Sequence, residues 1–453
     1  MRKIFLGFVI LFIIFGYMFY ANQKIDFDKL VANSELKEKK FEKMPREIIT
    51  SQNIKYWIIE DPQIDLISLS FSFNKAGTAY DTEDKLGLSL ITAQMLDSGT
   101  KDYDYEKYHN ILDLHGIVIS FNADKDYFNG IMTTPSYNKE QAFDLLNKVL
   151  FEPRMDEDFL ETLKKQFAVL VKTQKETPKS ELSVKFKQEI FGTHPYGRTI
   201  ETMADSVSQL QVNDVNVFLQ NALVKDNLVI SIAGNVTSDE ASTLIDSIFN
   251  GFNKYNDVKQ IEAPKLNLNP ETKMIDRETA QVISMFALAG VKRLDKDFYP
   301  LYIANHIFGG SGLNSRLSIE TREKEGLTYG VYTYLVTDDL SPLIMGSFSC
   351  VPENYDKMKK LLSDQMRKFS AHGVTKEELK SAKDYLLASY NLRFKSTLEL
   401  SNMLNLMQKS KLGLDFLQKR NDYVTQVTLE EVNDVAKQYF QHTPKEVAIG
   451  LIK

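Results

Sequence analysis

The feature that most constrains the fold is a sequence pattern of about 200 residues that occurs twice in the chain. MDEDFL at 155–160 resembles VTKEEL at 374–379, and both place an Asp or Thr where it can cap the start of a long helix. VNDVNVF at 212–218 resembles LEEVNDV at 429–435. The offsets of 219 and 217 residues are too long for a solenoid repeat, so we predict a duplicated domain.

Each copy has the same order of elements. An alternating apolar strand at 65–73 precedes a helical stretch at 86–96, and a strand at 280–288 precedes a helix at 297–307. An apolar strand also closes each copy, at 228–233 and 446–450. Short strands mixed with helix pairs are typical of α+β folds. We therefore predict two homologous α+β domains, each a largely antiparallel sheet with helices packed on one face, which together enclose a cleft.

The first residues have the character of a targeting or membrane segment. Arg2 and Lys3 precede an uncharged run at 4–20, which is long for the core of a cleaved signal and just long enough to span a bilayer. We predict a signal or anchor helix at 1–21 and favour an uncleaved anchor over a cleaved signal or a buried core helix. The charged residues at 22–44 are typical of a tether. The bulk of the chain is then exported to the periplasmic side, anchored to the inner membrane or soluble after signal cleavage.

Charge and metal-binding residue types exclude several function classes. The net charge is −6, and a nucleic-acid-binding protein would show a basic excess or stripe, so we expect no nucleic-acid partner. Cys350 is the single cysteine, which excludes an internal disulfide and a cysteine-based metal site. No two of the six histidines lie four residues apart, so local metal-site spacing is absent.

Four motifs, in their order and spacing, resemble the M16 peptidases, the pitrilysin-like zinc peptidases that include mitochondrial processing peptidase. They are GLSLITAQMLDSGT at 87–100, HPYG at 194–197, NLVISIAGNV at 227–236, and GG, SRL and REKEGLTY within 309–329. The resemblance covers about residues 45 to 453. It implies a first M16-like domain at 45–262 and a second at 263–453, with the boundary in the polar stretch near 252–270.

The first motif departs from the family at the residues that bind zinc. Active members use His-x-x-Glu-His on one helix, where two His ligands share a face and the Glu is the general base. The matching positions here are Leu90, Ala93 and Gln94. The stretch that matches the family's third ligand, 169–171, is entirely apolar. We therefore expect no metal at this degenerate motif and interpret it as a core helix.

The second-domain motif is intact. Arg322 and Tyr329 match the family's Arg/Tyr pair, and Gly326 between them is typical of a helix C-terminus. The resemblance implies that Arg322 lies in the last turn of a helix, that Tyr329 lies on the next strand, and that both reach the cleft. There they would hold the substrate carbonyl and the developing oxyanion opposite the zinc. Arginine is scarce in this chain, with 11 Arg against 44 Lys, which favours this interpretation over a helix-capping Arg and a strand-filling Tyr.

Other candidates have structural interpretations. We expect His194 to order its loop, His306 to lie at a core or its edge, and Cys350 to be a small buried side chain. The glycine-rich stretch at 309–312 lacks the pattern of a phosphate-binding loop, and we expect a flexible turn there.

Three functional hypotheses follow. The favoured one is a non-catalytic subunit, inactive alone and without its own zinc, that forms a heterodimer with an M16 subunit bearing His-x-x-Glu-His and zinc, and that acts on peptides in the cell envelope. The second is an inert M16-fold peptide-binding or scaffold protein, like the core proteins of the respiratory bc1 complex. The third is a self-sufficient enzyme with another metal site, for which His109 and His115, flanking Asp113, have poor spacing.

Overall fold

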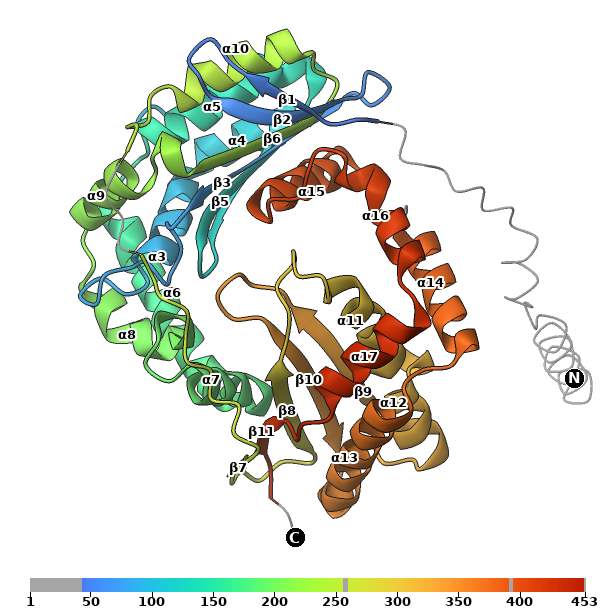
Figure 1. Ribbon diagram of the computed structural model, residues 1–453. Helices are drawn as coiled ribbons and strands as arrows, with labels where there is room; N and C mark the ends of the chain where they lie inside the picture. Colours follow the sequence, from blue (N-terminus) through green and yellow to red (C-terminus); the bar gives the residue numbers. More distant parts are fainter. Residues whose placement is uncertain (1–42, 256–259, 391–393, 452–453) are drawn as a thin grey trace, which may run out of the picture. The chain divides into compact units, whose positions relative to one another are not determined.

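The computed structural model describes residues 43–255, 260–390 and 394–451 (Figure 1). The predicted helix at 1–21 and nearly all of the tether at 22–44 lie outside the described residues. Residues from Lys43 onward form one compact unit. Among the described helices, none combines the length and apolar character that a bilayer span requires.

The first half, residues 43–255, is built on a six-stranded sheet in the order β1-β2-β6-β3-β5-β4. All neighbouring strands are antiparallel except the parallel pair β2 and β6. The strands are β1 Arg46–Ile49, β2 Lys55–Glu60, β3 Leu66–Asn74, β4 Val118–Ala123, β5 Tyr127–Pro135 and β6 Leu228–Gly234.

The helices of this half are α3 Leu88–Met95, α4 Tyr105–His115, α5 Lys139–Phe151, α6 Glu157–Glu176, α7 Pro178–Phe191, α8 Ile200–Gln209, α9 Val212–Ala222 and α10 Ser238–Phe249. Except for α7, their apolar faces and one face of the sheet form a single core. Phe71 of β3 packs edge-on against Phe249 of α10 with ring centroids 5.1 Å apart. Burial of such aromatic side chains is the main stabilising term for a sheet covered by helices.

The second half, residues 260–451, repeats this topology without an equivalent of β1. Its five-stranded sheet has the order β7-β11-β8-β10-β9, with only β7 and β11 parallel. The strands are β7 Thr272–Ile275, β8 Val282–Ala289, β9 Gly330–Val336, β10 Leu343–Cys350 and β11 Lys445–Ile449. The matching strand order shows the duplication in three dimensions.

The helices of the second half are α11 Phe298–Asn305, α12 Arg316–Ser318, α13 Tyr355–His372, α14 Lys376–Tyr390, α15 Thr397–Lys409, α16 Phe416–Gln426 and α17 Leu429–Phe440. Phe308, Phe369 and Phe440 pack ring against ring between α13, α17 and the segment after α11. They belong to a second core, separate from that of the first half.

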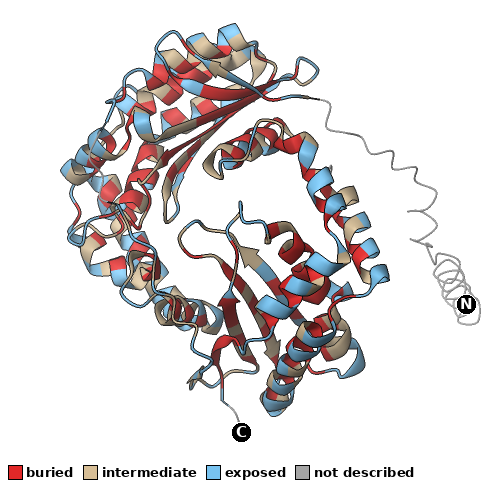
Figure 2. Ribbon diagram, viewed as in Figure 1, coloured by how far each residue is buried: buried red, intermediate tan, exposed pale blue. Residues whose placement is uncertain are grey.

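Each sheet also carries a helix from the other half. α15 packs on β3 and β6 through hydrogen-bonded polar side chains, and α7 packs on β8 and β11 through Leu182, Phe186 and Ile190. Figure 2 shows that β3 in the first sheet and β11 in the second are buried along most of their length. The helices that surround each core lie on one face of the sheet, as expected. The opposite face of each sheet is covered by one helix of the other half, which was not expected.

The structure confirms the predicted α+β fold and its elements. The strands expected at 65–73 and 280–288 are β3 and β8, and the closing strands are β6 and β11. The predicted caps are also present: the Asp156 carboxylate accepts from the backbone of Asp158 and Phe159 at the start of α6, and Thr375 accepts from the backbone of Glu378 in α14. The domain division at 262/263 and the enclosed cleft stay predictions.

Candidate functional site

The degenerate zinc motif lies on α3, whose start is held by a buried carboxyl group. Asp81 accepts from the backbone N–H groups of Gly87 and Ser89 and from the Ser89 hydroxyl, at 2.9 to 3.1 Å. Burial raises the pKa of Asp81 to about 7, against the lowering effect of these hydrogen bonds and of the Arg198 charge. Arg198 in turn donates to the carbonyls of Thr78, Ala79 and Asp81. This network fixes the helix on which a catalytic motif would lie.

The side chains at the motif positions do not fit a zinc ion. Leu90 is half-buried, Ala93 is buried, and Gln94 is exposed on the same face as Leu90. Aliphatic side chains bind no metal, and a lone amide oxygen is a poor zinc ligand. On α6, Val169 and Leu170 are exposed at the positions that match the third ligand. Across the described residues, no group of three His, Cys, Asp or Glu side chains could hold a metal ion.

Of the two histidines of the third hypothesis, His109 has a local partner in Asp97. His109 of α4 lies with Nε2 3.2 Å from the carbonyl oxygen and 3.5 Å from the carboxylate of Asp97. Burial raises the pKa of Asp97, and the neighbouring His109 lowers it. His115 lies in the last turn of α4, where the helix dipole favours a positive charge. Asp97 was missed in the sequence because it lies 12 residues from its partner.

Arg322 and Tyr329 flank a helix end of the second half. Arg322 lies in a π-helical turn, Ile319–Lys324, and Gly326 follows with φ of +62°, so Gly326 ends the helix as predicted. Backbone hydrogen bonds from Gly326 to Arg322 and from Leu327 to Thr321 close this end. Tyr329 does not lie on the next strand as predicted, since β9 begins one residue later, at Gly330. Just before Tyr329, the Thr328 hydroxyl donates to the Ser349 carbonyl and accepts from the Gly330 N–H.

Both side chains of the pair are unengaged. Arg322 is half-buried, and the Tyr329 side chain is 80% exposed. Within the described ranges, neither side chain has a hydrogen bond or ion pair. Most other arginines are engaged: Arg316, for example, is paired with Glu378, and Arg277 with Glu181. Arg322 and Tyr329 are therefore free to donate to an external group.

The remaining sequence candidates have structural roles. The His194 ring accepts from the backbone N–H of Tyr196, and its other nitrogen lies 2.8 Å from the Glu262 carbonyl, which orders the loop as expected. Cys350 is buried on β10, and burial raises the pKa of its thiol to about 11. His306 stacks on Tyr385, and burial lowers the pKa of His306.

The glycine-rich stretch differs from the expectation of a flexible turn. It forms a π-helical turn, His306–Gly310, followed by a short 3-10 turn at Gly312–Asn314. The turn packs closely on β9, since a Cβ atom at Gly309 would lie 2.4 Å from the Thr333 Oγ1. Glycine is needed here for this close approach.

Sequence reasoning did not single out Arg293, Asn305 or Thr333. All three line a cavity in the second half, and each has a buried polar atom without a hydrogen-bond partner among the described residues. The scarcity of arginine was the one sequence signal that could have pointed to Arg293.

Comparisons with known proteins agree with this structure. Residues 61–203 match the family described as insulinase (peptidase family M16), and residues 209–386 match the peptidase M16 inactive domain. The chain is 22% identical over 379 residues to the uncharacterized zinc protease YmxG of Bacillus subtilis, covering 83% of this chain and 90% of that protein. It is 24% identical over 370 residues to the non-peptidase homolog YmxG of Helicobacter pylori, covering 80% and 84% of the two chains.

A solved structure has the same fold. The crystal structure of the peptidase M16 inactive domain from Pseudomonas fluorescens superposes with a TM-score of 0.82 at 24% sequence identity. The match covers 90% of this chain and 98% of that one.

Proposed function

Because the chain belongs to the peptidase M16 family, we propose that it is the non-catalytic subunit of a heteromeric zinc metallopeptidase. Its partner is an M16 subunit that bears His-x-x-Glu-His and binds the zinc. This chain supplies Arg322 and Tyr329 to the shared site, where peptides of the cell envelope are cleaved. The relative in Helicobacter pylori is named a non-peptidase homolog, which agrees with an inactive role for this chain alone.

The observation that carries the proposal is the contrast between the two motifs. The zinc-binding positions Leu90, Ala93 and Gln94 offer no adequate ligand, whereas Arg322 and Tyr329 keep unengaged donors. A guanidinium and a phenol that point at an oxyanion stabilise a tetrahedral transition state directly.

The proposal is tested by mixing the full-length protein with an M16 subunit of the same host that carries His-x-x-Glu-His. We expect no cleavage of an internally quenched peptide by either protein alone and zinc-dependent cleavage by the mixture. Arg322→Lys and Tyr329→Phe should each lower kcat by about 10²-fold or more without preventing complex formation. Lys324→Ala is the matched control, because Lys324 is an exposed neighbour on the same turn and is paired with Glu320.

Zinc-dependent cleavage by this chain alone would overturn the proposal. Unchanged cleavage by the mixture with both variants would remove the Arg/Tyr pair from catalysis.

The alternative is a catalytically inert peptide-binding or scaffold protein. It is favoured by β9, an edge strand of its sheet that carries the exposed, stacked side chains of Tyr332 and Tyr334. An extended peptide can add to such an edge through backbone hydrogen bonds. Peptide binding that needs β9, with no cleavage in the presence of any M16 partner, would establish this function instead.

The cellular location belongs to the same proposal. The basic residues and apolar run at the N-terminus support export to the periplasmic side, with the inner membrane as the anchor. N-terminal sequencing of the mature protein distinguishes an uncleaved anchor from a removed signal.

A further inference from the structure

A cavity of about 440 Å³ lies in the second half, where α11, the turn His306–Gly310, β9 and α14 meet. Phe298 and Tyr302 of α11, Tyr334 of β9 and Tyr385 of α14 contribute aromatic rings to its walls. Its size is within the range of about 300–1,000 Å³ that is usual for small-ligand sites. The cavity is therefore large enough for one aromatic residue.

Residues that carry buried polar atoms without partners line this cavity. Asn305 and Thr333 are only 6% and 3% exposed, and neither the Asn305 Oδ1 nor the Thr333 Oγ1 has a hydrogen-bond partner among the described residues. The Asn305 amide orientation is set by its Nδ2, which donates to the Thr333 carbonyl at 3.3 Å. The free Oδ1 is thus an acceptor. Because unsatisfied buried polar groups are costly, a ligand that supplies an N–H group here is favoured.

The cavity also contains a cation without a counter-ion. The Arg293 guanidinium lies 3.9 Å from the Phe298 ring centroid, and its Nη2 donates to the Tyr299 hydroxyl at 3.4 Å. Its Nη1 is buried without a partner, and Arg293 forms no ion pair within the described part of the chain. A partly buried guanidinium held in place by aromatic rings is well suited to bind a carboxylate.

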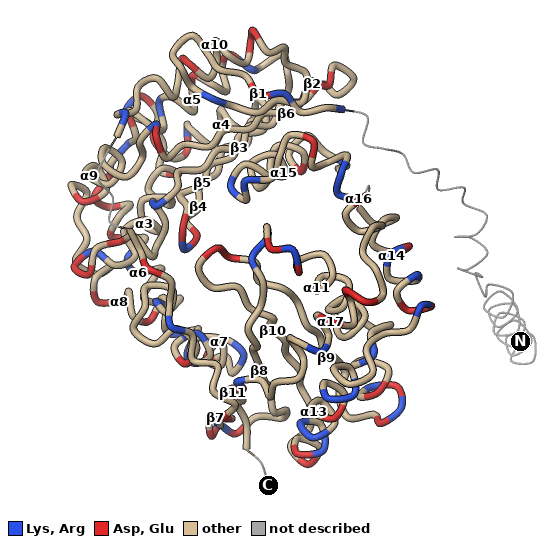
Figure 3. The backbone as a smooth tube through the Cα atoms, viewed as in Figure 1, with Lys and Arg blue, Asp and Glu red and all other residues tan. Residues whose placement is uncertain are grey.

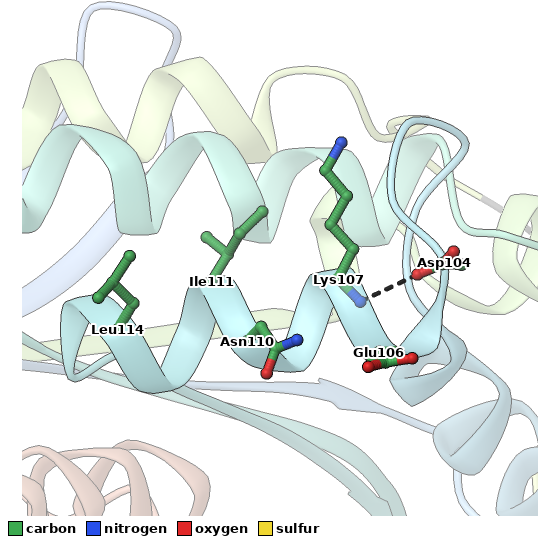
Figure 4. Close-up of a pocket in the computed structure, with 6 residues that line it drawn as sticks. All are labelled: Asp104, Glu106, Lys107, Asn110, Ile111 and Leu114. Atoms are coloured by element: carbon green, nitrogen blue, oxygen red, sulfur yellow. Dashed lines mark hydrogen bonds between the residues drawn. The ribbon is translucent and has the colours of Figure 1, made fainter.

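A shallow hollow on α4 lacks these features of the cavity. Figure 4 shows its lining residues on this one helix and at its start, with the Asp104 carboxylate bonded to the Lys107 backbone. None of these described residues has a buried polar atom without a partner. That hollow has no feature that would select a ligand.

We propose that the cavity in the second half binds an aromatic residue that ends in a free carboxylate. The carboxylate binds Arg293, an N–H group of the same residue donates to the Asn305 Oδ1, and the ring lies between the aromatic walls. A free aromatic amino acid and the C-terminal residue of a peptide share this chemistry. The site stands on the second half alone and does not depend on a zinc-bearing partner.

Calorimetric titration of the full-length protein tests the proposal without any substitution. The probes are L-tyrosine, N-acetyl-L-tyrosine and the peptide Gly-Gly-Tyr, each compared with its C-terminal amide. We expect saturable binding of carboxylates and binding of the amides weaker by about tenfold or more, since a charge-assisted hydrogen bond is lost. Tighter binding of Gly-Gly-Tyr than of tyrosine identifies a peptide C-terminus, and the reverse identifies a free amino acid. The proposal is overturned if no carboxylate binds at millimolar concentration or if the amides bind equally well.

A charge-removing variant assigns the binding to Arg293. Arg293→Gln should weaken carboxylate binding by about tenfold or more, whereas Lys292→Gln removes the same charge from the exposed neighbouring residue and should leave binding unchanged. Asn305→Leu is a second variant that removes the Oδ1 acceptor and should also weaken binding. Equal affinities of the Arg293 and Lys292 variants would place the ligand elsewhere.

Discussion

Asp81 is a buried carboxyl group at the start of α3, the helix that carries the degenerate zinc positions. Burial raises its pKa from 3.8 to about 7, so the folded protein holds a proton that the unfolded chain has already lost between these values. The free energy of unfolding should therefore fall as pH rises from about 4 to 7 and then level off. Relative to Asp81→Asn, which cannot ionise, the loss between pH 4 and pH 8 should be about 4 kcal/mol.

Urea unfolding of both proteins across this pH range measures the difference. A constant difference in unfolding free energy between wild type and Asp81→Asn would mean that the Ser89 and Gly87 hydrogen bonds keep Asp81 ionised throughout.

At the same scale, the sequence could reveal only residues that belong to a motif. Leu90, Ala93, Gln94, Arg322 and Tyr329 were found by matching positions, and Gly326 by the chemistry of a helix end. The unpaired atoms of Asn305 and Thr333 could not be found in this way. Their burial depends on α11 packing against β9, whose residues are remote in sequence, and neither lies in a recognisable motif.

At the scale of elements, the contact between α15 and β3 is a polar ladder. Ser68, Ser70 and Ser72 alternate along β3, and their hydroxyls lie 2.8 Å from the side chains of Thr397, Ser401 and Asn405. The spacings match, because every second residue of a strand and every fourth residue of a helix repeat at about 6–7 Å. The alternation predicted the strand. In the sequence, however, polar residues that face a second layer have the same pattern as polar residues that face solvent. For this reason the packing of α15 on β3 was not predicted.

Replacing Asn405 should weaken this ladder. Asn405→Leu removes the acceptor of the Ser72 hydroxyl and a donor to the Ser70 and Val229 carbonyls, so we expect a loss of about 2–3 kcal/mol in unfolding free energy. Leu406→Ala, on the exposed side of the same helix, should change it by less than about 0.5 kcal/mol. Urea unfolding measures these free energies. If Asn405→Leu were as stable as Leu406→Ala, the polar ladder would not stabilise the packing of α15 on β3.

At the scale of the whole described chain, each half contributes one helix to the sheet of the other half. α15 covers the first sheet, α7 covers the second, and an ion pair joins Lys125 of the β4–β5 turn to Asp338 after β9. Figure 3 shows that charges of both signs are otherwise spread over the helices and loops of the described residues. The sequence predicted two similar domains from the repeat, but it could not predict the exchange, because a repeat specifies each copy and not how two copies pack.

The exchange predicts that the halves unfold in one transition. Trp57, the single tryptophan, is buried on β2 and so reports on the first half through its fluorescence. Phe369 is fully buried in the core of the second half, and Phe369→Ala should cost about 3–5 kcal/mol. Since each sheet needs a helix of the other half, this remote change should lower the urea midpoint of Trp57 fluorescence as much as that of far-ultraviolet circular dichroism. Phe143→Ala, in the first core, is the matched control and should shift both signals equally. A Trp57 midpoint that is unchanged by Phe369→Ala would mean that the halves unfold independently and that the exchanged helices contribute little to cooperativity.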